Sequence, residues 1–382
     1  MFFAASRDQR QYFSALSEQL AKKGDIESDV VWYRALIRPR FLIKYPVRRL
    51  WREASLLTIR KQNSRKGKHY PDFVWPVFTG FNFLQACWLY AIYSAWLTTI
   101  SAQAIGVWNG KKFRQAILGL AAEVMQKKTI FFETGPLPGM SAIDSKGVNF
   151  YSSIPSNLDF YLNRSLSATA KETTENDEVI RPSHLPKQFV LVPFQVVEDS
   201  NIYLHSHWIR HMRQLFDLCK SMSEKLDRKI TFVFKEHPAC DEQYDDLRHQ
   251  QTPNLRFIDD FSTSELVGFA DAIITVNSTV GIEGLMARKK VFVLGDALFG
   301  IDGISYVANS EKKLLHYLKH LEQLELNETA IVSFIDYLKN DYAIPENAMK
   351  EPGDQHWQAA NRRLSLLLEG NDDQALSIKN KG

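Results

Sequence analysis

The stretch IITVNSTVGIEGLMARKKVFVLGDALFGIDG, residues 273–303, decides the fold of this chain. Residues 272–276 are apolar, as is typical of a strand buried on both faces of a parallel sheet. Residues 277–279, Asn-Ser-Thr, stand where a helix would begin, and Val291–Leu294 predicts the next strand. The pattern therefore indicates a strand-helix-strand unit. Its hydroxyl-lined turn suits either a plain helix cap or a phosphate site.

The alternation of strands and helices continues on both sides of this stretch. It predicts an α/β fold of two doubly wound, Rossmann-like domains, with ligands at the carboxyl ends of the strands. We place the N-terminal domain at residues 1–187, with a polar linker at 165–187, and the second domain at 188–345. The remaining residues, 346–382, are expected to form a helix and tail that pack back on the N-terminal domain.

Length and composition favour a cytoplasmic globular protein. The chain has 382 residues, enough for two domains, with 45% hydrophobic and 24% charged residues. Three cysteines without short-range pairing argue against a disulfide framework or a zinc site and fit a reducing compartment. The first ten residues, MFFAASRDQR, lack the basic and long apolar regions that are typical of a signal peptide.

A basic segment lies at residues 34–68. It holds twelve Lys and Arg against one acid, Glu53, and apolar residues such as Phe41 and Trp51 stand between the charges. This mixture suits the surface of an anionic membrane, because the cations meet the headgroups while the apolar side chains meet the acyl boundary. A solvated basic face on a core helix is the alternative interpretation. No nucleic-acid-binding module accompanies the segment, so we expect no nucleic-acid partner.

An uncharged aromatic stretch follows at residues 73–109. We predict a buried helix over 83–101 that leads into a strand at 105–108. Residues 84–108 could also be read as a membrane span, but polar residues and crowded aromatic residues favour the buried helix.

In the N-terminal half, polar residues follow two of the predicted strands. Asn109 lies in a Trp-Asn-Gly sequence that predicts a turn. Because Asn and Gly readily adopt the backbone angles of a turn, a purely structural role is sufficient to account for both residues. Glu133 ends an apolar strand and is either a general acid/base or a structural carboxylate that holds the Gly/Pro-rich loop after it. Asp144 is a rival carboxylate for the same role.

In the second half, three further groups of polar residues follow strands. Gln195 and Asp199 come after the first of them, where Asp199 is either a helix cap or a nucleophile. Lys235, His237 and Pro238 follow the next strand, and Pro238 stops it, so that a cation and an imidazole stand at its end. Ser278, Thr279 and Glu283 belong to the opening stretch.

Several ligand-binding motifs are absent from the sequence. It contains no G-x-x-x-x-G-K-[ST], G-x-G-x-x-G, H-E-x-x-H or D-x-D. We therefore predict no cofactor and no metal, since a metal-bridged sugar-nucleotide site commonly needs paired carboxylates. A phosphate would be held instead by hydroxyl groups, a helix N-terminus and Lys235.

Taken together, these motifs resemble the capsule polysaccharide biosynthesis family of bacterial β-Kdo transferases. The resemblance rests on WNG at 108–110, FETGPLPG with D and GVN at 132–149, VPFQVVEDSNI at 192–202, KEHP at 235–238 and NSTVGIEGL…KKVFVLGDALFGIDG at 277–303. It covers most of the chain, in order, but not the basic segment or the tail. It is strongest to the branch that starts the poly-Kdo linker on a phosphatidylglycerol-type lipid.

The resemblance implies a GT-B-type, metal-independent glycosyltransferase that retains configuration by double displacement. Asp199 would be the nucleophile and Glu133 the acid/base. The expected donor is CMP-Kdo, and its binding residues are implied to be the following: Lys235, His237 and Pro238 for CMP, Ser278 and Thr279 for phosphate, Glu283 for ribose or cytosine, and Gln195 and Asn109 for the sugar.

The resemblance and the basic segment together imply the partners. The N-terminal domain would face an anionic lipid acceptor and the second domain would bind the CMP-sugar. We expect a cytoplasmic enzyme bound peripherally to the inner membrane, with capsule assembly proteins as further partners. Two alternatives stay open: a transferase that uses another nucleotide-sugar donor for lipopolysaccharide or O-antigen acceptors, and a non-catalytic docking subunit of a capsule assembly complex.

Overall fold

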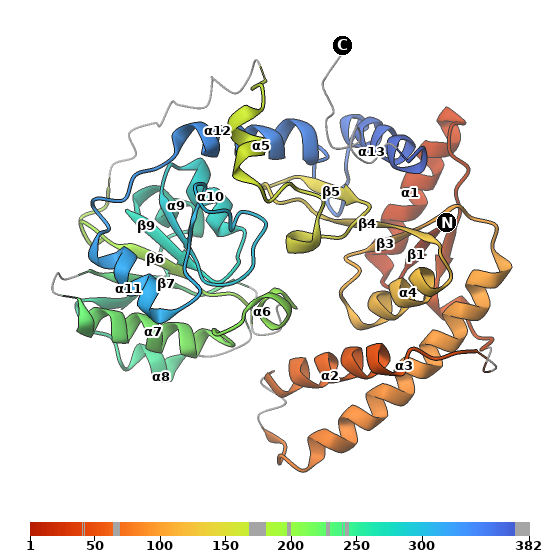
Figure 1. Ribbon diagram of the computed structural model, residues 1–382, viewed down its shortest axis with the longest axis horizontal. Helices are drawn as coiled ribbons and strands as arrows, with labels where there is room; N and C mark the ends of the chain where they lie inside the picture. Colours follow the sequence, from red (N-terminus) through yellow and green to blue (C-terminus); the bar gives the residue numbers. More distant parts are fainter. Residues whose placement is uncertain are drawn as a thin grey trace. The chain divides into compact units, whose positions relative to one another are not determined.

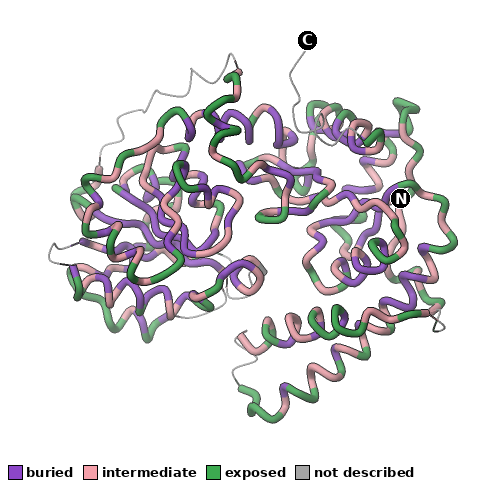
Figure 2. Tube along the Cα trace, in the orientation of Figure 1, coloured by how far each residue is buried: buried purple, intermediate pink, exposed green. Residues whose placement is uncertain are grey.

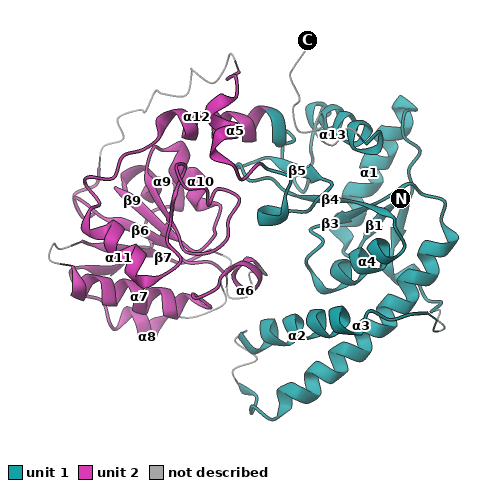
Figure 3. Cartoon of the chain, viewed as in Figure 1, with its two compact units in different colours: residues 1–154, 341–382 teal, residues 155–340 magenta. Residues whose placement is uncertain are grey.

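The computed structural model describes residues 1–39, 41, 43–63, 69–167, 181–196, 200–226, 230–238, 240 and 244–370. The chain divides into two compact units, one of residues 1–154 with 341–382 and one of residues 155–340 (Figure 3). Each unit has its own sheet with helices on both faces, and buried residues concentrate in the strands (Figures 1 and 2). The predicted fold class, two doubly wound α/β domains, is confirmed.

The first unit contains a five-stranded sheet in the order β2-β1-β3-β4-β5. Its strands are parallel except for β5, which runs antiparallel to β4. The chain order reverses between β1 and β3, so this sheet has a switch point there. The strands are β1 (Phe2–Ala4), β2 (Val30–Trp32), β3 (Ala104–Trp108), β4 (Lys128–Thr134) and β5 (Ser141–Asp144).

Helices cover both faces of this sheet, and the alternation of side chains along β1 shows why. Phe2 points to the face covered by α1 and α13 and stacks on Phe13 at 5.1 Å between ring centroids. Phe3 points to the face covered by α3 and α4 and meets the Tyr93 ring at 5.4 Å. The helices are α1 (Arg7–Lys23), α2 (Val47–Asn63), α3 (Val74–Thr99), α4 (Phe113–Val124) and α13 (Asp354–Leu368).

The aromatic stretch forms a longer and more exposed helix than the sequence predicts. The predicted helix over 83–101 begins nine residues earlier, at Val74. Only one face of its first half is buried, where α2 packs beside it. In its second half, which α4 and the sheet cover, residues 90–94 are all buried (Figure 1). Within the described residues, no helix is long and apolar enough to cross a membrane.

The second unit contains a six-stranded, all-parallel sheet in the order β11-β10-β9-β6-β7-β8. Counted from β8, the strands follow the Rossmann order 3-2-1-4-5-6, with β6 as the first strand. The strands are β6 (Val190–Pro193), β7 (Phe232–Lys235), β8 (Leu255–Phe257), β9 (Ala272–Thr275), β10 (Lys290–Val293) and β11 (Tyr306–Val307).

The helices of this unit again form two layers, with α7 and α11 on one face and α9 and α10 on the other (Figure 1). The opening stretch of the sequence analysis forms β9, α10 and β10, as predicted. The predicted helix over 207–226 begins only at Met212, because the His211 side chain caps it by accepting from the Gln214 N–H. The helices are α5 (Leu158–Asn163), α6 (Ser200–His205), α7 (Met212–Lys225), α8 (Asp245–Arg248), α9 (Thr263–Phe269), α10 (Val280–Met286), α11 (Glu311–Lys319) and α12 (Glu328–Tyr337).

The unit boundaries differ from the predicted ones at 187 and 345. The second unit begins at residue 155 because α5 packs on α12: Tyr161 meets the Phe334 ring at 5.3 Å. The chain re-enters the first unit at residue 341, where the fully buried Arg363 on α13 donates hydrogen bonds to the carbonyl oxygens of Ile143, Asp341 and Tyr342. The C-terminal helix is therefore part of the first unit's core.

Candidate functional site

The switch point of the second unit lies between β6 and β9. Gln195 follows β6 and Asn277 follows β9, and both side chains are buried. The Gln195 amide nitrogen donates to Asn277 Oδ1 at 3.0 Å, and Gln195 Oε1 accepts from the Asn277 backbone N–H at 3.3 Å. Asn277 Nδ2 also donates to the Asn201 carbonyl at the start of α6. Ligands of doubly wound sheets bind at such a point, and this amide pair lies at its base.

Ser278 and Thr279 continue the same turn toward α10. The Ser278 N–H donates to Thr275 Oγ1 at 3.0 Å, and Ser278 Oγ accepts from the Val280 N–H at 3.3 Å. Ser278 is half-buried and Thr279 is exposed. The turn is thus held by its own hydroxyl contacts. Thr279, the N-cap residue of α10, makes no side-chain cap hydrogen bond, and its side chain is exposed at the carboxyl edge of the sheet.

Glu283 lies one turn into α10 and is half-buried. Burial raises the pKa of its carboxyl above the ordinary value. A carboxylate that loses water without gaining a cation is stabilised by a ligand that donates hydrogen bonds, such as ribose hydroxyls or an amino-pyrimidine.

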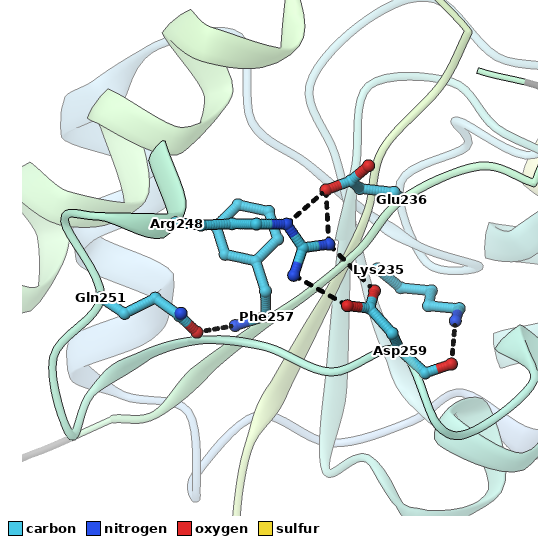
Figure 4. Close-up of polar contacts among 6 residues, drawn as sticks. All are labelled: Lys235, Glu236, Arg248, Gln251, Phe257 and Asp259. Atoms are coloured by element: carbon cyan, nitrogen blue, oxygen red, sulfur yellow. Dashed lines mark hydrogen bonds and ion pairs between the residues drawn. The ribbon is translucent and has the colours of Figure 1, made fainter. Parts of the chain in front are cut away.

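Lys235 is the last residue of β7, and a network of charged side chains braces the strand end beside it (Figure 4). Arg248 joins Glu236, which follows β7, to Asp259, which follows β8, with the shortest contact to each at 2.6 and 2.7 Å. The hydrogen bond from Arg248 lowers the pKa of the Asp259 carboxyl. Lys235 Nζ donates to the Asp259 carbonyl oxygen at 2.9 Å, so the bracing also fixes the ammonium group.

His237 and Pro238 follow directly and are exposed at the same edge. Because all strands of this sheet are parallel, the ends of β6, β7 and β9 lie along one edge. The structure therefore brings Gln195, Lys235 and the 277–279 turn to a common edge, with β6 between the other two strands.

In the first unit, Asn109 follows β3, Glu133 lies near the end of the neighbouring strand β4, and their side chains meet. Asn109 Nδ2 donates to Glu133 Oε2, and Glu133 Oε1 accepts from the N–H of Thr134 at 2.9 Å and from its hydroxyl at 3.1 Å. Asn109 and Gly110 both have positive φ, 64° and 74°, and a Cβ on Gly110 would lie 2.5 Å from the Phe131 ring. The Trp-Asn-Gly turn therefore positions the amide that orients the half-buried Glu133.

Asp144, the rival carboxylate, holds the structure of a loop. It is buried, and Oδ1 accepts from the N–H groups of Lys146 and Gly147. Oδ2 accepts from the N–H and hydroxyl of Ser153 and from the Tyr342 hydroxyl at 2.7 to 3.1 Å. Five donors occupy both oxygens, which leaves this carboxylate no capacity to serve a substrate.

Two predicted features need separate mention. Asp199, the predicted nucleophile, lies outside the described residues. Within the residues that the structure does describe, no group of three or more His, Cys, Asp or Glu side chains could hold a metal ion.

Two cavities lie away from these edges. One of about 840 Å³ opens at the amino-terminal edge of the first sheet, beside Phe2 and Ala104, and one of about 170 Å³ at the amino-terminal edge of the second, beside Val190 and Lys290. Doubly wound sheets bind their ligands at the opposite edge, so we assign no ligand to either cavity.

Two features of the edges escaped the sequence analysis. The Glu236–Arg248–Asp259 network joins residues that are separated in the chain. The only sequence signal for Glu236 and Asp259 is that each follows a strand. Lys111 follows the Asn109 turn, with its ammonium 3.8 Å from the centroid of the Tyr151 ring. Burial lowers the pKa of Lys111, against the opposing effect of the Glu53 carboxylate, so this cation is partly desolvated at the edge that carries Glu133.

The family model described as capsule polysaccharide biosynthesis protein matches residues 164–338, which is nearly all of the second unit. Residues 164–338 are therefore similar in sequence to this family. The matched region contains the amide pair, the Lys235 strand end and the 277–279 turn, so every predicted binding residue of the second unit lies in the family segment.

Relatives by sequence support the same family. The chain is 33% identical over 213 residues to Protein FixF of Sinorhizobium fredii, covering 54% of this chain and 52% of FixF. It is 29% identical over 132 residues to the capsule polysaccharide export protein KpsS of Escherichia coli, covering 32% and 34%. The matches span about half the length of FixF and about a third of KpsS.

Among solved structures, the chain resembles the KpsC β-Kdo 2,7 transferase of Thermosulfurimonas dismutans, with 18% identity, a TM-score of 0.43 and coverage of 63% of this chain and 78% of that one. It also resembles the UDP-GlcNAc 2-epimerase of Methanocaldococcus jannaschii, with 11% identity, a TM-score of 0.38 and coverage of 88% and 98%.

Replacing the two rival carboxylates should separate their roles. We expect Asp144→Asn to lower the free energy of unfolding by about 2–4 kcal/mol, because an amide nitrogen would face N–H and O–H donors in a buried site. Glu133→Gln should change it by less than about 1 kcal/mol, because the half-buried amide keeps an acceptor for Thr134. Urea titration measures both, and an unaffected Asp144→Asn variant would contradict the structural role of Asp144.

Glu283→Gln should show a pH-dependent gain in stability. The raised pKa means that the folded state holds this proton more tightly than the unfolded chain, so the stabilising contribution is present below the ordinary value of 4.5 and is lost as the pH rises through the folded pKa. The variant and the wild type should therefore unfold alike at low pH, and the variant should be the more stable at pH 7. Thermal unfolding across this range tests the sign, and a variant that is less stable at pH 7 would refute it.

Proposed function

We propose that this protein is a glycosyltransferase of capsule polysaccharide synthesis that transfers Kdo from CMP-Kdo to an anionic lipid. One observation carries the proposal: the polar residues after β6, β7 and β9 meet at the carboxyl edge of a Rossmann-order sheet, inside the segment that matches the capsule family. The family description, capsule polysaccharide biosynthesis protein, and the name of KpsS, a capsule polysaccharide export protein, support a role in capsule synthesis.

The donor would bind the second unit. Lys235 would neutralise the phosphate of CMP, helped by the Ser278 and Thr279 hydroxyls, while His237 and Pro238 would border the nucleotide at the exposed end of β7. Glu283 would accept hydrogen bonds from ribose or cytosine, which would relieve the cost of its partial burial. Gln195 would be oriented toward the sugar by its bonds to Asn277.

Catalysis would use two carboxylates in two steps. Asp199 would attack the anomeric carbon, forming a glycosyl ester as the bond to the phosphate oxygen breaks and CMP leaves. Glu133 would then take the proton of the acceptor hydroxyl, whose oxygen attacks the same carbon and releases the Asp199 carboxylate. Two inversions give net retention. Asn109 donates a hydrogen bond to Glu133 through its amide nitrogen and so orients the carboxyl group.

The acceptor would be a phosphatidylglycerol-type lipid. The basic segment 34–68 attracts anionic headgroups, and a peripheral position at the inner membrane would bring the enzyme to this substrate. Other capsule assembly proteins would be its partners there.

Intact-mass measurement after incubation with CMP-Kdo alone tests the proposal. We expect an adduct of one Kdo residue on the wild type and on Glu133→Gln, and none on Asp199→Ala. Asp217→Asn, at an exposed carboxylate on α7, is the matched control and should keep the adduct. With lipid acceptor present, Glu133→Gln should release CMP beyond the first equivalent about 10²–10⁴ times more slowly than the wild type, because only the second step uses Glu133.

Each other outcome has a definite meaning. Release of CMP on addition of lipid without any adduct would keep the transferase and remove the covalent step. An adduct from a different nucleotide sugar would replace the donor. Neither an adduct nor CMP release with any donor and acceptor would reject the enzyme in favour of a docking subunit.

A further inference from the structure

One face of α3 carries an unpartnered row of large apolar side chains. Phe73, directly before the helix, and four residues on it are 48–77% exposed. Their spacing of four, four, three and four residues places them within an arc of about 80° along about 22 Å of helix, at 100° and 1.5 Å per residue. The members of this row, called here the α3 stripe, are Phe73, Val77, Phe81, Leu84 and Trp88.

The stripe lies on the face of α3 that is turned away from the core of the first unit. The opposite face of α3 supplies the buried residues, among them Trp75, Asn82 and Tyr90, and Asn82 donates to the Thr58 hydroxyl on α2 at 3.0 Å. Because α2 and the core already cover that opposite face, the fold does not require the stripe residues to be apolar. Contiguous apolar surface of this kind marks an interaction site.

The stripe extends onto the segment before it. Trp51 on α2 contacts the Phe83 ring at 5.4 Å, and Phe41 contacts the Trp88 ring at 5.5 Å, with Trp51 and Phe41 themselves 48% and 57% exposed. Phe41 therefore adds exposed apolar surface directly beside the stripe, and Trp51 adds exposed apolar surface on α2. The α2–α3 hairpin extends away from the sheet of its unit (Figure 1).

Positive charge is concentrated in the same part of the chain. The described residues within 34–99 include eight Lys and Arg and two acids, Glu53 and Asp72, a formal net charge of +6. On α2, Arg48 and Arg52 are exposed and each is the chain neighbour of an exposed apolar residue, Val47 and Trp51. Arg49, by contrast, pairs with Glu123 on α4 and is not free to serve the surface.

We infer that the α2–α3 hairpin is a membrane-binding element whose α3 stripe inserts into the interface of an anionic bilayer. A one-sided helix with aromatic and aliphatic residues outward and cations beside them has the pattern of an in-plane interfacial helix. The bordering cations complement anionic headgroups, which neither an apolar protein groove nor a second copy of this equally basic hairpin would do. The inference deepens the proposed function by naming the surface that meets the acceptor's membrane.

Vesicle sedimentation without donor tests the inference separately from the transfer reaction. The wild type should bind mixed phosphatidylcholine–phosphatidylglycerol vesicles and bind pure phosphatidylcholine weakly. The triple variant Phe73→Ser, Val77→Ser, Phe81→Ser should bind the mixed vesicles at least about tenfold more weakly. A matched control, Val124→Ser, Leu162→Ser, Met349→Ser, removes exposed apolar residues elsewhere and should bind as the wild type does.

A charge variant separates the two contributions. Arg48→Ser with Arg52→Ser should weaken binding to the mixed vesicles about thirtyfold at low salt, and the difference should shrink at high salt while the stripe's contribution persists. Circular dichroism should show unchanged helix content in every variant, because all replaced side chains are exposed.

Three results would overturn the inference. The first is a wild type that binds neither kind of vesicle, and the second is a stripe variant that binds vesicles as the control does. The third is a wild-type protein that is a dimer and a stripe variant that is a monomer, with vesicle binding unchanged. That result would show that the stripe binds a second copy of the chain. If the protein forms a Kdo adduct but does not bind vesicles, the proposed function is retained and only the membrane-binding role of the hairpin is rejected.

Discussion

The pairing of β6 with β9 is the constraint on which the second unit depends. β6 lies in the middle of the sheet, with β7 and β8 on one side and β9 to β11 on the other. The chain therefore adds strands first on one side of β6 and then on the other. Ligands of doubly wound sheets bind at the carboxyl edge of such a switch point. The Gln195–Asn277 amide pair joins the two strand ends there. The Arg248 network then fixes the neighbouring end of β7.

Much of this arrangement could be predicted from the sequence because the central strands are continuous apolar runs that end abruptly in polar residues. Gln195, Lys235 and Ser278 were all placed after strands for that reason, and parallel strands bring such positions to one edge. In the first unit the same reasoning placed Asn109 and Glu133, which the structure joins by a hydrogen bond. The short elements β5, α5 and β11 were missed, because two to six residues give too few periods for a pattern to register.

What the sequence could not predict depends on tertiary partners. The buried position of Arg363 follows from the return of the chain after α12, which no local pattern encodes. Asp144 and Glu133 look alike as carboxylates after apolar residues, and only the five donors around Asp144 distinguish the anchor from the candidate acid/base. The sequence predicts a buried helix over 83–101 but not its exposed face, since an uncharged sequence does not tell which face lacks a partner.

The central claim is that the carboxyl edge of the second sheet binds the nucleotide of the donor. Calorimetric titration of CMP, without sugar or lipid, tests it most directly. The account predicts that CMP binds the wild type, that Lys235→Ala weakens the binding at least about tenfold by removing a charge-assisted phosphate contact, and that Lys290→Ala at the amino-terminal edge leaves it unchanged. Equal affinity in the wild type and Lys235→Ala, or a loss confined to Lys290→Ala, would contradict it.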